Sequence, residues 1–182
     1  ALVYENYEGG SAKLDLCIEL IQSAVESGHK ILLFSQFTSM IEILTARLQE
    51  ESISCFVLQG STKKEQRAQM VEQFNRDDTS VFCISLKAGG TGLNLTGADI
   101  VIHYDPWWNV AVENQATDRA HRIGQKNVVT VYKLIAKGTI EEKIIKLQQM
   151  KKELAEEILS GDEIKTASFQ REELLELLEE RF

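Results

Sequence analysis

The sequence predicts an α/β domain built on a doubly wound, mostly parallel sheet over residues 11–137. Short apolar runs such as ILLF (31–34) alternate along the chain with longer segments whose apolar residues recur at helical spacing. A strand that is apolar at consecutive positions is typical of a sheet covered on both faces. Its alternation with helices indicates parallel strands joined by helical crossovers.

Each element follows from a local pattern. In the first helix, Leu14, Ile18 and Ile21 form one apolar stripe and Gly28 ends the segment. The predicted helices are 11–30, 37–50, 62–75 with an N-cap at Ser61 or Thr62, and 109–121. The predicted strands are 30–35, 53–58, 80–85, 99–104 and 128–134. Beyond Gly138 we expect a long helix over 139–159, a polar segment over 160–170 and a short helix over 171–182.

The acidity of the chain is concentrated at one end. The net charge is −8, and residues 153–182 hold ten acidic and three basic residues, a balance of −7. The remaining residues are close to neutral, so a local basic surface for a nucleic acid is compatible with the overall charge. The apolar runs are strand-sized, so we expect no membrane span.

The three cysteines lack the spacing of a zinc site or a disulfide framework. We expect Cys17, Cys55 and Cys83 to be small apolar residues in a reducing compartment. The chain opens at Ala1 without a methionine or a secretory signal, which suggests a segment of a longer protein.

The loops at the carboxyl ends of the strands are the expected ligand sites: 35–37, 59–62, 85–95 and 105–109. The glycine-rich stretch SLKAGGTGLNL (85–95) fails as a phosphate loop, because the chain contains no Gly-Lys pair. It also fails as a dinucleotide fingerprint, since Leu95 replaces the third glycine and no acidic residue ends the second strand. A purely structural turn stays open at this point.

Two further features lie in DPWWN (105–109). Asp105 ends a strand as a magnesium-binding aspartate of an ATPase would, but without a phosphate loop we favour a turn residue. Trp107 and Trp108 are adjacent and cannot both face the core of an extended segment, so we expect one to be partly exposed. Such a ring is a candidate for stacking or for insertion into a groove, and packing on the neighbouring helix is the alternative.

An arginine pair stands out in ENQATDRAHRIGQ (113–125). Arg119 and Arg122 are three residues apart, which puts them on one face of a helix, with Gln115 one turn earlier on the same side. Either Asp118 and nearby glutamates neutralise them, or they bind an anion such as phosphate.

Taken together, these segments resemble one family. ILLFSQFTSMIEIL, LQGSTKKEQR, FCISLKAGGTGLNLTGADIVIHYDPWWN and ENQATDRAHRIGQ resemble helicase motifs IV, IVa, V and VI of the SWI/SNF-type ATPases, which are superfamily-two DNA translocases and chromatin remodellers. LIAKGTIEEKI resembles the brace element that follows. Val110 departs from the pattern, because the family usually has proline there.

The resemblance implies a RecA-like second lobe whose partner lobe lies elsewhere in the parent protein. It implies a linker over 1–10, the C-terminal helicase lobe over 11–137, a brace helix over 138–159 and an acidic tail with a short terminal helix over 160–182. ATP and Mg²⁺ would be held mainly by the first lobe, which carries the phosphate loop. We therefore expect this chain alone to be inactive.

The resemblance also assigns roles to residues. Arg119 and Arg122 would be arginine fingers reaching the ATP of the first lobe, positioned by Gln115 and Gln125, with Gly92 and Asn94 lining the cleft near the ribose. Contacts with the DNA backbone would come from small or polar loop residues, and Trp108 would contact the tracked groove. These loop residues are Ser35, Gln36, Gly60, Ser61, Thr62, Ser85, Lys87, Gly89 and Gly90.

The implied partners are double-stranded DNA, the first lobe of the same parent chain and a DNA-bound protein as the remodelling target. The implied location is inside the cell, in the nucleus of a eukaryote or the cytoplasm and nucleoid of a prokaryote. The alternative is a helicase-like module that binds nucleic acid or protein without catalysis. An RNA helicase is the nearest rival within the superfamily, and DPWWN and GTIEEKI argue against it.

Overall fold

A computed structural model of the chain describes residues 9–86, 88, 93–121, 125 and 127–160, with side chains as far as residue 153. Its centre is a five-stranded sheet, and the five parallel strands confirm the predicted fold class. The strand order, β2-β3-β1-β4-β5, is given by the structure alone. The strands are β1 (Ile31–Ser35), β2 (Cys55–Leu58), β3 (Val81–Ser85), β4 (Ile100–His103) and β5 (Thr130–Lys133).

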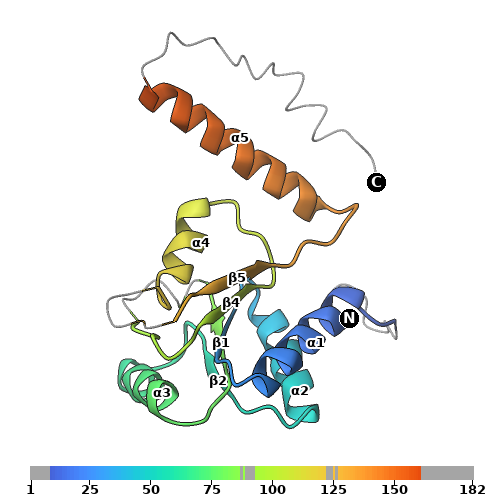
Figure 1. The fold of residues 1–182 in the computed structure, drawn as a ribbon. Coiled ribbons are helices and arrows are strands. Elements are labelled where there is room, and N and C mark those ends of the chain that lie inside the picture. Colours follow the sequence, from blue (N-terminus) through green and yellow to red (C-terminus); the bar gives the residue numbers. More distant parts are fainter. Residues whose placement is uncertain (1–8, 87, 89–92, 122–124, 126, 161–182) are drawn as a thin grey trace.

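Helices cover the sheet on both faces (Figure 1). The helices α1 (Ala12–Glu26) and α2 (Thr38–Glu50) pack on one face, in a core that includes Leu33, Cys83 and Ile102 of the sheet. The helices α3 (Lys64–Arg76) and α4 (Val110–Thr117) pack on the other, where Phe34 and Phe82 join the core. Consecutive residues of β1 thus face opposite cores, which explains why this strand is apolar at successive positions.

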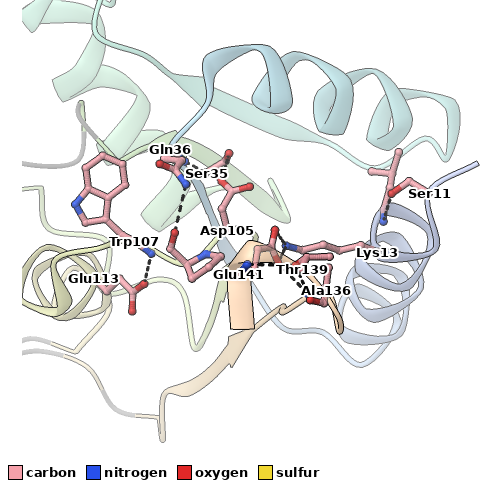
Figure 2. A network of polar contacts seen from close by, with 12 residues as sticks. Ser11, Lys13, Ser35, Gln36, Asp105, Trp107, Glu113, Ala136, Thr139 and Glu141 are labelled. Carbon is pink, nitrogen blue, oxygen red and sulfur yellow. Dashed lines mark hydrogen bonds and ion pairs between the residues drawn. The ribbon is translucent and has the colours of Figure 1, made fainter. Parts of the chain in front are cut away.

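A long helix, α5 (Ile140–Ser160), leaves the sheet after β5 (Figure 1). Gly138 adopts a positive φ of 71° in the connecting turn, and the Glu142 carboxylate accepts a hydrogen bond from its amide at 2.9 Å. The Thr139 hydroxyl accepts from the Glu141 amide at 3.2 Å, which satisfies a free donor of the first turn. Lys13 Nζ of α1 lies 2.6 Å from Glu141 Oε2, so an ion pair ties α5 back to the first helix (Figure 2).

Three local predictions are wrong. All four residues of β5 are exposed, although the sequence predicts a buried strand, because β5 is an edge strand and its faces are incompletely covered. Helix α3 begins at Lys64 with Lys63 as its N-cap, since the Thr62 hydroxyl instead accepts from the Gln59 amide at 3.1 Å. Helix α4 ends at Thr117 rather than at residue 121, and residues 118–120 form a turn.

The structure also tests the predictions on the cysteines and the membrane span, but not those on the two ends of the chain. Cys17 and Cys83 are buried as predicted, and Cys55 is half-buried. None of the helices within the described ranges is both long and apolar enough to cross a bilayer. The predicted terminal helix (171–182), most of the linker (1–10) and most of the acidic tail lie outside the described residues, and the domain boundaries stay predictions.

Candidate functional site

The predicted ligand loops meet at one edge of the sheet. Ser35 and Ser85 pair in register at the ends of β1 and β3, and the Leu86 amide donates to the Ser35 carbonyl at 2.9 Å. The Tyr104 amide donates to the Phe34 carbonyl at 2.9 Å, which continues the same edge past the end of β4. Parallel strands therefore bring the loops of the motif IV and motif V segments together, as an open α/β sheet does at its ligand edge.

Asp105 holds the loop of β1 against the loop of β4. Its Oδ2 accepts from the Ser35 hydroxyl at 2.5 Å and from the Gln36 amide at 3.0 Å, and Gln36 Nε2 donates to the Pro106 carbonyl at 3.3 Å (Figure 2). Burial raises the pKa of the Asp105 carboxyl above its usual value, while the Ser35 and Gln36 hydrogen bonds act in the opposite direction. These contacts agree with the interpretation of Asp105 as a turn residue.

The residues predicted to contact DNA differ in exposure. The side chains of Ser35 and Ser85 are buried, and the Ser85 hydroxyl accepts from the Ala88 amide at 3.3 Å. Gly60 and Ser61 are exposed, and Gln36 and Thr62 are half-buried. Lys87, Gly89 and Gly90 lie outside the described residues, so the DNA contacts of this whole group stay predictions.

Arg67 of α3 clamps the loop over 59–62, a role that the sequence reasoning missed. Its guanidinium donates to the carbonyls of Thr62 at 2.8 Å, Gln59 at 3.2 Å and Gly60 at 3.1 Å. It also donates to the Ala88 carbonyl at 3.3 Å, which joins the loops of motifs IVa and V. The sequence feature that could have indicated this role is the position of Arg67 at the end of LQGSTKKEQR, one helical turn beyond the loop.

Arg119 lies in the turn after α4 rather than on the helix. It is 2% exposed, whereas Gln115 is exposed, so the prediction that both share one helical face is wrong. The reason is the end of α4 at Thr117, after which the Arg119 amide bonds to the Ala116 carbonyl at 3.2 Å. Arg122 and Gly92 lie outside the described residues.

Motif V and the arginine turn are joined directly. The Leu95 amide donates to the Arg119 carbonyl at 3.0 Å, and Asn94 is exposed beside it. Gln125 Nε2 lies 2.6 Å from the Ala98 carbonyl, 3.2 Å from that of Thr96 and 3.3 Å from that of Ala120. Gln125 is therefore placed to position the turn that carries Arg119, and its predicted place in an ATP cleft stays a prediction.

Glu113 is a buried hub beneath the tryptophan loop that the sequence reasoning also missed. The carboxylate is 1% exposed and accepts from the Trp107 amide at 2.6 Å, Lys133 Nζ at 2.5 Å and Gln148 Nε2 at 3.1 Å. Gln148 of α5 also donates to the Trp107 carbonyl. The tryptophan loop, the edge strand β5 and α5 thus all bond to the same carboxylate, that of Glu113.

The two tryptophans divide as the sequence predicts. Trp107 packs against the core on the α3 and α4 side, while Trp108 is 47% exposed. Asn109 caps α4, because its side-chain oxygen accepts from the Ala111 amide at 3.0 Å. The helix therefore begins at Val110 without the proline that the resembled family usually has there.

The site lacks an evident metal centre of its own within the described ranges. There, no group of three or more His, Cys, Asp or Glu residues is placed to hold a metal ion. Asp105 is buried, and its Oδ2 already accepts hydrogen bonds from Ser35 and Gln36.

The helicase conserved C-terminal domain family matches residues 12–124, which span the sheet edge and its loops as far as the arginine turn. The chain belongs to this family. Similarity to a chromatin-remodeling ATPase supports the predicted SWI/SNF-type character of this lobe. Similarity to a solved ATPase-domain structure supports the predicted RecA-like fold.

Two curated proteins and one solved structure show which proteins this lobe is similar to. The lobe is 47% identical over 170 residues to an uncharacterized ATP-dependent helicase of Mycoplasma pneumoniae, covering 93% of this chain and 16% of that protein. It is 43% identical over 169 residues to the human chromatin-remodeling ATPase INO80, covering 92% of this chain and 11% of the relative. The crystal structure of the C-terminal part of the Fun30 ATPase domain matches with a TM-score of 0.74 and 37% identity, over 79% of this chain and 47% of that one.

The lobe therefore corresponds to less than a fifth of the length of these two curated relatives. It is a helicase C-terminal domain of the class found in ATP-dependent helicases and chromatin-remodelling ATPases.

Proposed function

We propose that this chain is the second motor lobe of an ATP-dependent double-stranded DNA translocase or remodeller. Its arginines would complete the ATP site of a first lobe, and its sheet-edge loops would hold the DNA backbone. The observation that carries the proposal is the junction of motifs V and VI, where the Leu95 amide and the Gln125 side chain bond to the turn that bears Arg119.

In this proposal, Arg119 and Arg122 stabilise charge that develops on the transferred phosphoryl group. Arginine fingers contribute about 10³–10⁵ in rate because their donors arrive at the phosphate only in the closed complex. ATP and Mg²⁺ are held mainly by the first lobe, with Gln115, Gly92, Asn94 and Gln125 on this side of the cleft. The chain alone is then inactive.

DNA is held by phosphate contacts from the loops after β1, β2 and β3, with Trp108 against the groove. Such contacts position a duplex without reading its sequence, which suits a motor that must move along any sequence. A translocase acts where the chromosome is, so the proposed location is the nucleus or the bacterial nucleoid. A DNA-bound protein is the proposed target of the motor.

A second candidate is a module that binds nucleic acid or protein without assisting hydrolysis. The burial of Arg119, which is only 2% exposed in the lobe, is the observation that favours it.

The two candidates are separated by the DNA-stimulated ATP turnover of the full-length parent. If Arg122 is a finger, Arg122→Ala lowers turnover by about 10³-fold or more while ATP still binds. The matched control is Arg76→Ala, since Arg76 is an exposed arginine of α3 that pairs with Glu72 at 2.7 Å, and its turnover should be unchanged. Full turnover in Arg122→Ala would contradict the finger role and leave the non-catalytic module.

A further inference from the structure

A groove of about 540 Å³ lies between the start of α4 and the exposed side of α5. The exposed ring of Trp108 forms one wall, and two lysines of α5 form part of the other. The polar residues that line it are Trp108, Asn109, Asn114, Gln148, Lys151 and Lys152. We call it the Trp108–Lys151 groove.

The two walls are held in register by the buried hub. Gln148 donates to both the Trp107 carbonyl and Glu113 Oε1, so α5 is fastened to the tryptophan loop at this point. Lys151 and Lys152 follow Gln148 by three and four residues, which places them on the same side of the helix. The lysines therefore face the groove because Gln148 is fixed.

The charged residues that line the groove are both basic. Its lining residues, all within the described ranges, include two lysines and no aspartate or glutamate. Glu113, the buried carboxylate that contacts the lining residue Gln148, also accepts from the Trp107 amide and Lys133. Glu153, the next residue of α5, accepts from Gln149 Nε2 at 2.8 Å.

An exposed indole, side-chain amides and ammonium groups together suit a sugar-phosphate chain. The ammonium groups neutralise phosphates, the amides donate to sugar or phosphate oxygens, and the ring contacts an apolar edge of the sugar or base. A peptide of acidic residues alone, such as polyglutamate, would use the lysines but would offer the exposed ring no apolar partner.

We propose that the Trp108–Lys151 groove binds a segment of the DNA backbone, with Lys151 and Lys152 on phosphates and Trp108 at the adjoining groove of the duplex. This inference rests on the proposed function and extends the DNA contact from the sheet-edge loops to α5. The footprint on the duplex is then longer than the loops alone would give.

The test measures equilibrium binding of the full-length parent to a duplex of random sequence, without ATP, across a series of salt concentrations. The affinity falls as salt rises, so the slope of log affinity against log salt is negative. Removing two phosphate contacts with Lys151→Ala/Lys152→Ala should make this slope less steep by about 2. The matched control, Lys137→Ala/Lys146→Ala, removes two exposed lysines outside the groove and keeps the slope. Lys151→Arg/Lys152→Arg should restore it, since arginine also neutralises phosphate.

The outcomes separate this inference from the proposed function. If the wild-type parent binds DNA but the Lys151→Ala/Lys152→Ala slope equals that of the control, the groove does not hold DNA and the inference is overturned. If that variant keeps its DNA affinity but loses affinity for a polyglutamate peptide, the occupant is an acidic protein segment, which also overturns it. If the wild-type parent fails to bind duplex DNA at all, it is the proposed function that fails.

Discussion

His103 shows how one residue reports on the interior of the site. It ends β4 with 1% exposure, stacks on Phe34 with ring centroids 5.5 Å apart, and has Nε2 3.1 Å from the Thr117 hydroxyl. Its pKa is lowered from 6.5 to about 4, chiefly because burial disfavours the charged ring. Lys133 also lowers the pKa, and Glu113 acts against both.

This shift makes stability depend on pH. Below pH 6.5 the unfolded chain takes up a proton at His103 that the folded chain does not accept until about pH 4, so stability is full above 6.5 and falls with pH across this window. Lowering the pH from 7.5 to 5 should cost the wild type about 2 kcal/mol relative to His103→Phe, which keeps an aromatic ring but does not titrate. Denaturant unfolding of both proteins at the two pH values measures the difference. A pH-independent difference between them would contradict the assignment.

At the scale of elements, Gly97 shows how the end of motif V is fastened to α3. Its amide donates to Asn75 Oδ1 at 2.9 Å, and Asn75 Nδ2 donates to the Asn94 carbonyl at 2.8 Å. A Cβ at residue 97 would lie 3.0 Å from Asn75 Oδ1 and 3.1 Å from Asn75 Cα. The second contact is with backbone inside a helix, which cannot move aside without disturbing α3.

Gly97→Ala should therefore destabilise the fold by about 1–3 kcal/mol, the usual range for overpacking a close contact. Gly60→Ala is the matched control for stability, because a Cβ there meets nothing within 4 Å. Its free energy of unfolding should stay within about 0.5 kcal/mol of wild type. Denaturant unfolding of the three proteins measures these free energies. An equal loss of stability in both variants would show that Asn75 shifts to accommodate the added methyl group at little cost.

The elements that sequence predicts well are those whose pattern is set by burial alone. The ILLF run of β1 and the stripe of α1 have no competing local bond, and both appear where predicted. The start of α3 and the end of α4 depend on tertiary contacts instead. Thr62 closes its own loop rather than capping a helix, and Arg119 leaves the helix to enter the interior. The spacing of apolar residues therefore does not predict where α3 begins or where α4 ends.

The candidate site was predictable in its loops but not in its supports. The family motifs locate the sheet edge, Trp108 and the arginine turn. Arg67 and Glu113 each join a nearby loop to partners that are distant in sequence: Arg67 bonds to Ala88, and Glu113 bonds to Lys133 and Gln148. Those distant partners are visible only in three dimensions.

For the whole molecule, Glu113 is the point where the sheet, the tryptophan loop and α5 meet. Glu113→Gln keeps an acceptor for the Trp107 amide but removes the charge that pairs with Lys133 at 2.5 Å. We expect a loss of about 1–3 kcal/mol, less than for a fully buried pair because Lys133 is 38% exposed and can be rehydrated. Amide hydrogen exchange should quicken both at Trp107 and along α5.

Glu72→Gln is the matched control, since Glu72 is an exposed α3 glutamate paired only with Arg76 among the described contacts. It should leave exchange in α5 unchanged and alter stability by less than about 0.5 kcal/mol. If Glu113→Gln lowers stability without changing exchange in α5, the buried carboxylate does not couple the helix to the loop.

The central position of β1 has a consequence for how the protein is made. Ile31 pairs with Val81 and with Ile100, partners that lie 50 and 69 residues later in the chain. At about 5–20 residues per second, a ribosome leaves the ILLFS strand without either neighbour for about 3–10 s. During that interval this buried central strand is a nascent segment with unpaired backbone on both edges, so chaperone demand during synthesis should peak before residue 81 emerges.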